Sequence, residues 1–392
     1  MWLACGFSAG CPGGLRRGLP VALDAPAKGC DAVITQLQLR RDALTESRLV
    51  ELPQPELAEG EVLLAIDRFA LTANNVSYAL SGATIGYWGY FPAPEPWGLV
   101  PVWGFADVVA SRHPDLPVGE RIYGFFPTAS HVVLTPDAVG PRGFVDAAPH
   151  RAELPAFYNH YQRTTGEPEA MKALEDQRCL LLPLLGTGYL LYDYLVDNDF
   201  FGAEQVLVGS ASSKTAIGLL NMLARHPAPR PKVIGLTSPG NMAFVEGLGL
   251  CDQVIAYGDI DSLDGAVPSA FVDMAGDGVV IGAIHKRFGA QLKLSCAVGA
   301  THWDQPRSTG KVEGAPSHDF IFIPAHIAKR DGDLGPGVIQ RRTQAETMRM
   351  VEELKGSLAL RHVSGPDAVR SAMSDLVAGR TPPTVGLIAS LG

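Results

Sequence analysis

The residues best suited to chemistry lie in one stretch, 205–218, with the sequence QVLVGSASSKTAIG. Three apolar residues run into Gly209, small residues follow, and a helical period begins at Lys214. A buried strand, a tight turn and a helix start together form an anion site. Backbone N–H groups at a helix N-terminus point at the ligand, and the helix dipole favours negative charge. The stretch therefore predicts a nucleotide-binding turn.

Three interpretations of this turn compete. It resembles a dinucleotide-binding turn in which only Gly209 remains of the G-x-G-x-x-G pattern. It also resembles a P-loop, because Lys214-Thr215 follow the glycine and Ser213 stands in the place of that motif's second glycine. A later apolar run even ends in an acid, Asp273. The third interpretation is an ordinary strand–helix turn without a ligand.

Strand-like and helix-like segments alternate after the turn. The expected order is a strand at 232–237, a helix at 242–250, strands at 254–257 and 269–276, a helix at 281–288 and a strand at 293–301. This alternation predicts βαβ units and a doubly wound parallel sheet of the Rossmann type, hence an α/β fold. A P-loop NTPase is less favoured, since a long β-rich section precedes the turn and no N-K-x-D motif for guanine is present.

The section before the turn has the pattern of strands. Apolar and polar residues alternate from residue 33, and further strand patterns follow at 62–66, 101–111, 118–126 and 130–136. In this order the segments resemble the medium-chain dehydrogenase/reductase superfamily, in its zinc-independent quinone and enoyl reductase branches. The motifs that carry the resemblance lie at 71–82, 101–111, 118–124, 181–195 and 382–391.

The resemblance covers residues 32–392 and points to an uncharacterised branch, a domain of unknown function. It implies a β-rich, GroES-like catalytic domain split between 32–179 and 323–392. A dinucleotide-binding domain would occupy 180–322. Residues 1–31, rich in Gly, Ala and Pro, are expected to be a disordered extension.

The end of the second strand addresses the choice of cofactor. NAD-specific domains place an Asp or Glu there, which accepts from the ribose 2′-OH. This chain has hydroxyl and amide groups at 237–241, which can donate to a 2′-phosphate, so we expect NADP(H) rather than an ordinary Ser-Pro-Gly turn. The expected cofactor-binding residues are Gly209, Ser210, Ala211, Ser212, Ser213, Lys214, Thr215, Thr237, Ser238, Asn241, Met274, Ala275, Val298 and Gly299.

Lys214 carries a specific expectation. A side chain in the first helical turn points toward the helix N-terminus, so its ammonium can reach over the turn to the pyrophosphate or the 2′-phosphate. A cation beside the positive end of the helix dipole is unfavourable, which suggests that a bound anion offsets it. The alternative is a solvated lysine on the helix exterior.

The resemblance also implies catalytic residues. In those branches an Asn, followed three residues later by an Asp, lies near the nicotinamide. Asn74 and Ser77 match these positions, so the Asp is missing here. Tyr78 is the candidate acid, because its phenol directly follows; plain core packing is the alternative.

An aromatic run provides the expected substrate contacts. Its rings can stack on a flat, conjugated or aromatic substrate, and a hydrophobic loop packed on the sheet is the alternative. The long segment 150–178 adds His160 and Tyr161 as open candidates. The expected substrate residues are Tyr87, Trp88, Tyr90, Phe91 and Trp103.

We expect no metal. The zinc branch of the superfamily uses a Cys and a Gly-His-Glu stretch, where this chain has Asn74-Asn75 and Trp103-Gly104-Phe105. Structural zinc needs four closely spaced Cys, and the six Cys here are scattered singly. Such single Cys suit a reducing compartment, so we expect a cytoplasmic protein.

Composition excludes other classes of protein. With 46% hydrophobic and 19% charged residues the chain is ordinary for a globular protein. A net charge of −9 without a basic stripe argues against nucleic acid as the main partner. No run of about 18 apolar residues indicates a membrane span.

These residues together predict an NADP(H)-dependent, zinc-independent oxidoreductase that transfers hydride between the nicotinamide and an enone, quinone or ketone. The expected partner is a small conjugated or aromatic carbonyl compound, and a homodimer is the candidate assembly. One alternative is a cofactor-binding sensor or interaction protein that has lost chemistry, because the Asp is missing at position 77. The P-loop NTPase is the other.

Overall fold

The computed structural model describes residues 33–298 and 312–392. The expected extension 1–31 and the expected cofactor residue Gly299 lie outside these ranges.

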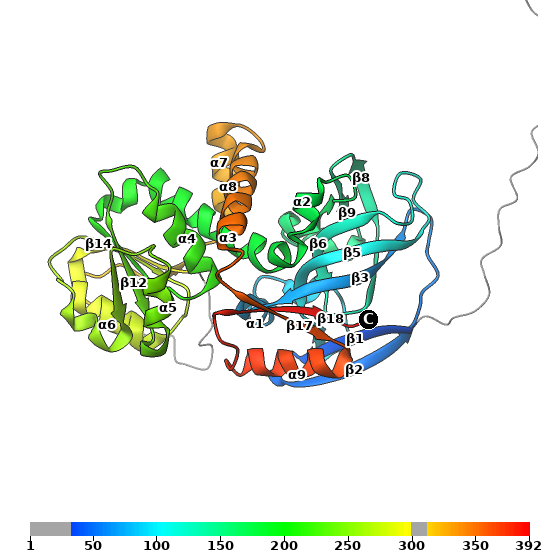
Figure 1. The fold of residues 1–392 in the computed structure, drawn as a ribbon, viewed down its shortest axis with the longest axis horizontal. Coiled ribbons are helices and arrows are strands. Elements are labelled where there is room, and N and C mark those ends of the chain that lie inside the picture. Colours follow the sequence, from blue (N-terminus) through cyan, green and yellow to red (C-terminus); the bar gives the residue numbers. More distant parts are fainter. Residues whose placement is uncertain (1–32, 299–311) are drawn as a thin grey trace, which may run out of the picture. The chain divides into compact units, whose positions relative to one another are not determined.

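The described residues contain a parallel sheet of six strands in the order β13-β12-β11-β14-β15-β16 (Figure 1). The strands are β11 (Gln205–Val208), β12 (Lys232–Thr237), β13 (Gln253–Ala256), β14 (Ser269–Asp273), β15 (Leu292–Ala297) and β16 (Asp319–Phe320). Val206 and Val208 pack on one face with α4 (Lys214–Ala224), and Leu207 packs on the other with α6 (Gly278–Phe288). Because helices cover both faces, the predicted doubly wound sheet is confirmed. A short helix, α5 (Met242–Gly247), follows β12.

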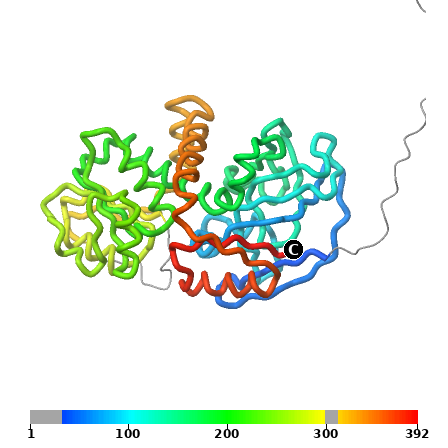
Figure 2. Tube along the Cα trace, viewed as in Figure 1, coloured from blue at the N-terminus to red at the C-terminus, as the bar shows by residue number. Residues whose placement is uncertain are grey.

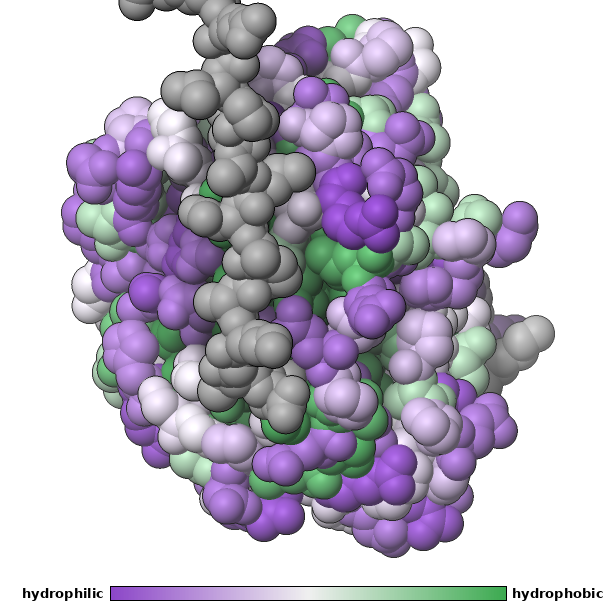
Figure 3. Space-filling model, turned by 90° about the vertical axis from the view of Figure 1, so that its right-hand side faces the viewer, coloured by the Kyte–Doolittle hydropathy of each residue, from purple (hydrophilic) through white to green (hydrophobic). Residues whose placement is uncertain are grey.

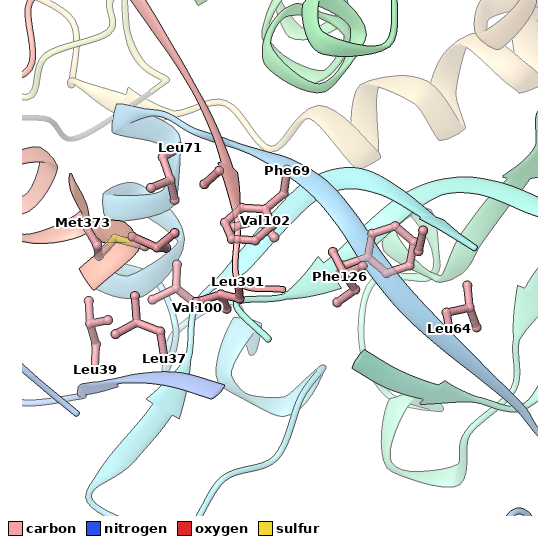
Figure 4. Close-up of a cluster of buried hydrophobic side chains, with 14 of the residues drawn as sticks. Leu37, Leu39, Leu64, Phe69, Leu71, Val100, Val102, Phe126, Met373 and Leu391 are labelled. Atoms are coloured by element: carbon pink, nitrogen blue, oxygen red, sulfur yellow. The ribbon is translucent and has the colours of Figure 1, made fainter. Parts of the chain in front are cut away.

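The remaining strands form largely antiparallel sheets. A three-stranded sheet has the order β2-β1-β4, and a nine-stranded sheet has the order β17-β18-β3-β5-β6-β10-β9-β8, with β7 paired to β3. The bounds are β1 (Val33–Arg40), β2 (Ala43–Pro53), β3 (Val62–Leu71), β4 (Trp97–Leu99), β5 (Pro101–Ser111), β6 (Arg121–Pro127), β7 (His131–Leu134), β8 (Pro136–Gly140), β9 (Gly143–Asp146), β10 (His160–Arg163), β17 (Ala359–Ser364) and β18 (Val385–Ser390). Their main core includes Leu37, Leu64, Phe69, Val102, Phe126, Met373 and Leu391 (Figure 4).

The C-terminal strand returns to the N-terminal sheet. β18 pairs antiparallel with β3, with Leu387 opposite Leu71 and Ile388 opposite Ala70. The red strand β18 accordingly runs beside the lighter blue strand β3 in Figures 1 and 2. Met373 of α9 (Pro366–Val377) packs into the same core. The β-rich part is thus built from two separate segments, and the predicted fold class is confirmed.

One long helix, α3 (Glu175–Asp197), contributes to both parts of the fold. Its Leu181 and Leu185 share a core cluster with Phe105 of β5 and Ile217 of α4. The domain boundary expected at 179/180 falls inside this helix, on which α7 (Ile323–Leu334) and α8 (Val338–Leu354) also pack. α3 has the length and hydropathy of a membrane span, but 67% of its most apolar window is buried, as in a core helix.

Hydrophilic side chains make up most of the face shown in Figure 3. The exposed large apolar side chains of the described residues are spread over many elements, as is normal for folded proteins: Val33, Leu52, Val109, Val118, Phe157, Val196, Val279, Phe320 and Phe322. The ring of Phe157, 47% exposed, lies 6.2 Å from the ring of Trp103, one of the expected substrate contacts.

Candidate active site

The predicted nucleotide turn connects β11 to α4. Ser213 caps the helix, because its hydroxyl accepts from the Ala216 N–H at 3.3 Å. A Cβ atom on Gly209 would lie 3.1 Å from the Asp273 carboxylate, so only glycine fits easily there. Ser210 has a positive φ of 50°, and its N–H donates to the Tyr257 hydroxyl at 3.0 Å. The first N–H groups of α4 have no intrahelical acceptor, which is the arrangement that binds anions.

Polar side chains from the end of β12 meet this turn. The Asn241 amide donates to the Ser212 hydroxyl at 3.3 Å, and the Thr237 hydroxyl lies 3.5 Å from the same oxygen. Ser238, between them in the sequence, is half-buried. The structure therefore brings together hydroxyl and amide groups that are 25–29 residues apart in the sequence. No carboxylate belongs to residues 237–241.

The ends of β14 and β15 complete the set of expected cofactor residues. The Asp273 carboxylate accepts from the N–H groups of Ala275 and Gly276, both at 2.9 Å, and fixes the turn that contains Met274. The Val298 N–H donates to the Asp273 carbonyl at 2.8 Å. β14 pairs with β11 and β15 pairs with β14, all in parallel, so these turns lie at the carboxyl edge of the sheet, where such folds bind ligands.

Lys214 does not have the predicted geometry. Its ammonium donates to the carbonyls of Pro383 and Val385, both at 3.1 Å, instead of reaching over the turn. Nor is it a freely solvated lysine, because these two carbonyls hold the ammonium and the side chain is half-buried. Burial lowers the pKa of Lys214 to about 8. The segment before β18 supplies acceptors that the local sequence around Lys214 does not reveal.

The expected catalytic residues lie on α1 (Ala73–Leu80), which directly follows β3. The Asn75 side chain accepts from the Thr72 N–H at 2.7 Å and so holds the helix start. Asn74, Ser77 and Tyr78 are spaced i, i+3 and i+4, so they share one face of the helix.

Tyr78 is the centre of a small polar group. Its hydroxyl accepts from the Trp103 indole N–H at 3.1 Å and forms a hydrogen bond with the Asn74 side chain. Burial raises the pKa of Tyr78 well above its usual value, so the phenol stays protonated at neutral pH. Two of the predicted catalytic residues thus meet one predicted substrate residue. Ser77 is half-buried on the same helix.

Aromatic rings surround Tyr78. The ring of Tyr87 lies 4.6 Å from it, and Tyr90 and Phe91 belong to the same cluster. Trp88, also expected to contact the substrate, belongs to a different cluster: its ring packs in the main β-rich core, in the space beside Gly82 and Gly98.

Two aromatic residues of this cluster, Phe125 and Tyr158, are not among the residues predicted from the sequence. The Tyr158 hydroxyl is 2.7 Å from the Tyr87 hydroxyl, and its ring lies 4.7 Å from that of Phe125. Phe125 belongs to a strand that was predicted, so its inward position could have been expected. Tyr158 lies in the 150–178 segment, where His160 and Tyr161 were the candidates instead. His160 is exposed, and Tyr161 is a core residue whose hydroxyl donates to the Phe125 carbonyl at 2.6 Å.

A second polar network lies beside Asp273. The Ser295 hydroxyl is 2.8 Å from both His285 Nε2 and His318 Nδ1, and His318 Nε2 is 3.5 Å from the Asp273 carboxylate. Ser295 and Asp273 are almost fully buried, so the network lies in the protein interior and reaches the 273–276 turn through Asp273. Among residues 33–298 and 312–392, no three His, Cys, Asp or Glu side chains are placed to hold a metal ion. Metal independence stays a prediction.

Known families and structures match most of the chain. A family model described as "Protein of unknown function (DUF2855)" matches residues 69–382. Curated proteins show no match. The structure of CurA from Vibrio vulnificus in complex with NADPH is similar with a TM-score of 0.56 at 14% identity, over 91% of this chain and 99% of that chain.

Two further structures are similar to the same extent. Mycobacterial Rv1454c complexed with NADPH has a TM-score of 0.54 at 16% identity, covering 91% of this chain and 99% of that chain. A mutant enoyl thioester reductase from Candida tropicalis has a TM-score of 0.54 at 11% identity, covering 92% of this chain and all of the other. At these identities the matches show the fold alone, which this chain shares with CurA, Rv1454c and the enoyl thioester reductase.

Proposed function

Because this chain belongs to the DUF2855 family and has the fold of NADPH-binding medium-chain oxidoreductases, we propose that it is an NADPH-dependent, zinc-independent oxidoreductase. Its substrate is an enone, quinone or ketone. One observation carries the proposal: Ser212, Thr237 and Asn241 meet beside the helix N-terminus of the nucleotide turn, without a carboxylate at 237–241. Donor groups of this kind suit a 2′-phosphate, which a carboxylate would repel.

Different residues would bind the cofactor, donate the proton and position the proton donor. NADPH, when bound, supplies the hydride. The turn after β11 orients the phosphates, and the turns after β14 and β15 line the same edge of the sheet. Tyr78 donates a hydrogen bond to the substrate carbonyl oxygen and then transfers its proton there. Asn74 and Trp103 hold the Tyr78 hydroxyl in place.

The aromatic cluster favours a flat, apolar substrate. Tyr78, Tyr87, Phe125 and Trp103 present rings and neutral polar atoms. The Arg151 guanidinium lies over the rings of Tyr90 and Phe91 in the same cluster, at 5.7 and 4.7 Å. Rings of this kind stack on conjugated or aromatic carbonyl compounds. Loss of NADPH absorbance with a panel of enones, quinones and ketones tests the activity.

A cofactor-binding sensor is the second candidate function. Ser77 stands where the resembling enzymes have an Asp, and this departure removes part of their proton relay. The sensor binds NADPH but does not oxidise it with any member of the panel. Binding without turnover would therefore favour the sensor over the enzyme.

The cofactor preference yields the first prediction. Wild-type protein is expected to bind NADPH more tightly than NADH, and Ser238→Asp is expected to narrow or reverse the preference because it brings a carboxylate to the 2′-phosphate. Ser238→Asn is the matched neutral control and should keep the preference. Calorimetric titration of both cofactors measures the effect, and equal wild-type affinities would contradict the prediction.

Metal independence yields the second prediction. Exhaustive treatment with a chelator is expected to leave NADPH oxidation unchanged, because Asn74, Asn75 and Trp103 offer no zinc ligand set. The rate is compared before and after chelation, with and without added zinc. A loss of activity that zinc restores would show this prediction to be wrong.

A further inference from the structure

Lys214 is a half-buried cation for which the described residues provide no anionic partner. Its ammonium is held by two neutral acceptors, the carbonyls of Pro383 and Val385. Within the part of the chain that the structure describes, no carboxylate forms an ion pair with it, and burial accounts for its lowered pKa. Lys214 also lines a pocket whose other residues, apart from Ser357, are apolar, among them Leu185, Ile217 and Phe244.

This arrangement is unfavourable by itself. Desolvation disfavours the charged amine, and the positive end of the α4 dipole adds to the effect. A methionine would fill the same apolar surroundings without either penalty. Lys214 therefore contributes little to stability as a packed side chain. Its role is better explained by its hydrogen bonds to the carbonyls of Pro383 and Val385.

The two carbonyls belong to the strand system of the catalytic residues. Val385 is the first residue of β18, which pairs with the end of β3 through Leu387 and Leu71. β3 leads through Thr72 into α1, which carries Asn74 and Tyr78. One side chain therefore connects the helix of the nucleotide turn to the strand pair that precedes the candidate catalytic helix.

We propose that Lys214 is a positioning residue that fixes the first turn of α4 to β18, and through β18 to α1, and that it is not a ligand of the cofactor phosphates. The proposal rests on the proposed function, since α4 would carry the cofactor and α1 the proton donor. Hydride transfer needs the reacting atoms within about 3–3.5 Å, and a misplacement of about 1 Å can slow a reaction roughly 10²-fold. Loss of the link should thus slow the reaction more than it weakens cofactor binding.

Hydrogen exchange tests the connection between Lys214 and β18 and does not require the protein to turn over a substrate. In Lys214→Met, amides in residues 383–390 and 69–80 are expected to exchange faster than in wild type, while β11 is unchanged. Lys232→Met is the matched control, because Lys232 is exposed at the first residue of β12 and its ammonium donates to the Gln253 side chain. Unchanged exchange at both segments in Lys214→Met would overturn the proposal, whether or not the protein is an oxidoreductase.

Cofactor titration separates positioning from phosphate binding. In Lys214→Met we expect the Kd for NADPH to change by less than about twofold and kcat to fall by roughly tenfold or more. A Kd that rises at least about tenfold with unchanged kcat would assign Lys214 to the phosphates and overturn the proposal. If this variant does not fold, hydrogen exchange of wild-type residues 383–390 is measured with and without NADPH. NADPH should slow this exchange or leave it unchanged. Faster exchange with NADPH would mean that the ammonium leaves both carbonyls, and would overturn the proposal.

If wild-type protein does not bind NADPH, the proposed function fails while the exchange result still reports on the link. Lys214→Arg keeps a charged donor and should restore part of the wild-type exchange pattern. The same exchange rates in Lys214→Arg as in Lys214→Met would contradict the assignment of the two carbonyl contacts.

Discussion

Tyr78→Phe is expected to lower kcat for carbonyl reduction by roughly 10²–10⁴-fold, the contribution of general acid catalysis, with little change in the Kd for NADPH. The substitution removes the hydroxyl that lies between the Trp103 indole and the Asn74 side chain and keeps the ring in its aromatic cluster. Stopped-flow measurement of NADPH oxidation reports the chemical step directly.

Tyr192→Phe is the matched control for this prediction. Tyr192 lies near the C-terminal end of α3, and its hydroxyl is 2.8 Å from His226 Nδ1, so its removal should leave kcat unchanged. If Tyr78→Phe reacts as fast as wild type, Tyr78 is a core residue and the proton must come from another group or from water.

Arg151→Leu is expected to destabilise the protein by roughly 3–5 kcal/mol, because it leaves the buried Asp146 carboxylate without its partner. The two side chains are 2% and 1% exposed and form an ion pair at 2.9 Å. Arg151 also donates to the Tyr90 carbonyl and the Tyr161 hydroxyl, which tie its segment to the aromatic cluster. Urea denaturation of both proteins measures the difference in the free energy of unfolding.

A double variant shows how much of the stability loss in Arg151→Leu comes from the unpaired Asp146 carboxylate and how much from lost packing. Asp146→Asn with Arg151→Leu removes both charges, and the Asn oxygen can still accept from the N–H groups of Thr135 and Ala148. The double variant should therefore recover part of the stability that Arg151→Leu loses. A loss below about 1 kcal/mol in the single variant would show that the Asp146 carboxylate is solvated or otherwise compensated.

Local patterns were enough for the parallel sheet and its turn. The apolar run before Gly209 and the helical period after Lys214 describe β11 and α4 directly, and the strand end at Thr237 follows from a similar run. Because parallel neighbours share one carboxyl edge, the contact between the turn and Asn241 follows from the predicted topology.

The partners of Lys214, the position of Trp88 and the contribution of Tyr158 depend on long-range contacts, which local sequence patterns do not reveal. The acceptors of Lys214 come 169 and 171 residues later in the chain, so its position in the helix gave a direction but no partner. Trp88 and Tyr87 are adjacent aromatic residues, yet one fills the core beside Gly82 and the other faces Tyr78. Tyr158 was missed because it lies in a segment without periodicity, which depends on tertiary contacts for its place.

The proposed function depends on binding of NADPH at the turn after β11, with the 2′-phosphate of NADPH near Ser212, Thr237 and Asn241. Calorimetric titration of the wild-type protein with NADPH and with NADH tests it most directly. We expect saturable binding of one NADPH per chain and clearly weaker binding of NADH. No binding of NADPH, or equal affinity for the two cofactors, would contradict it.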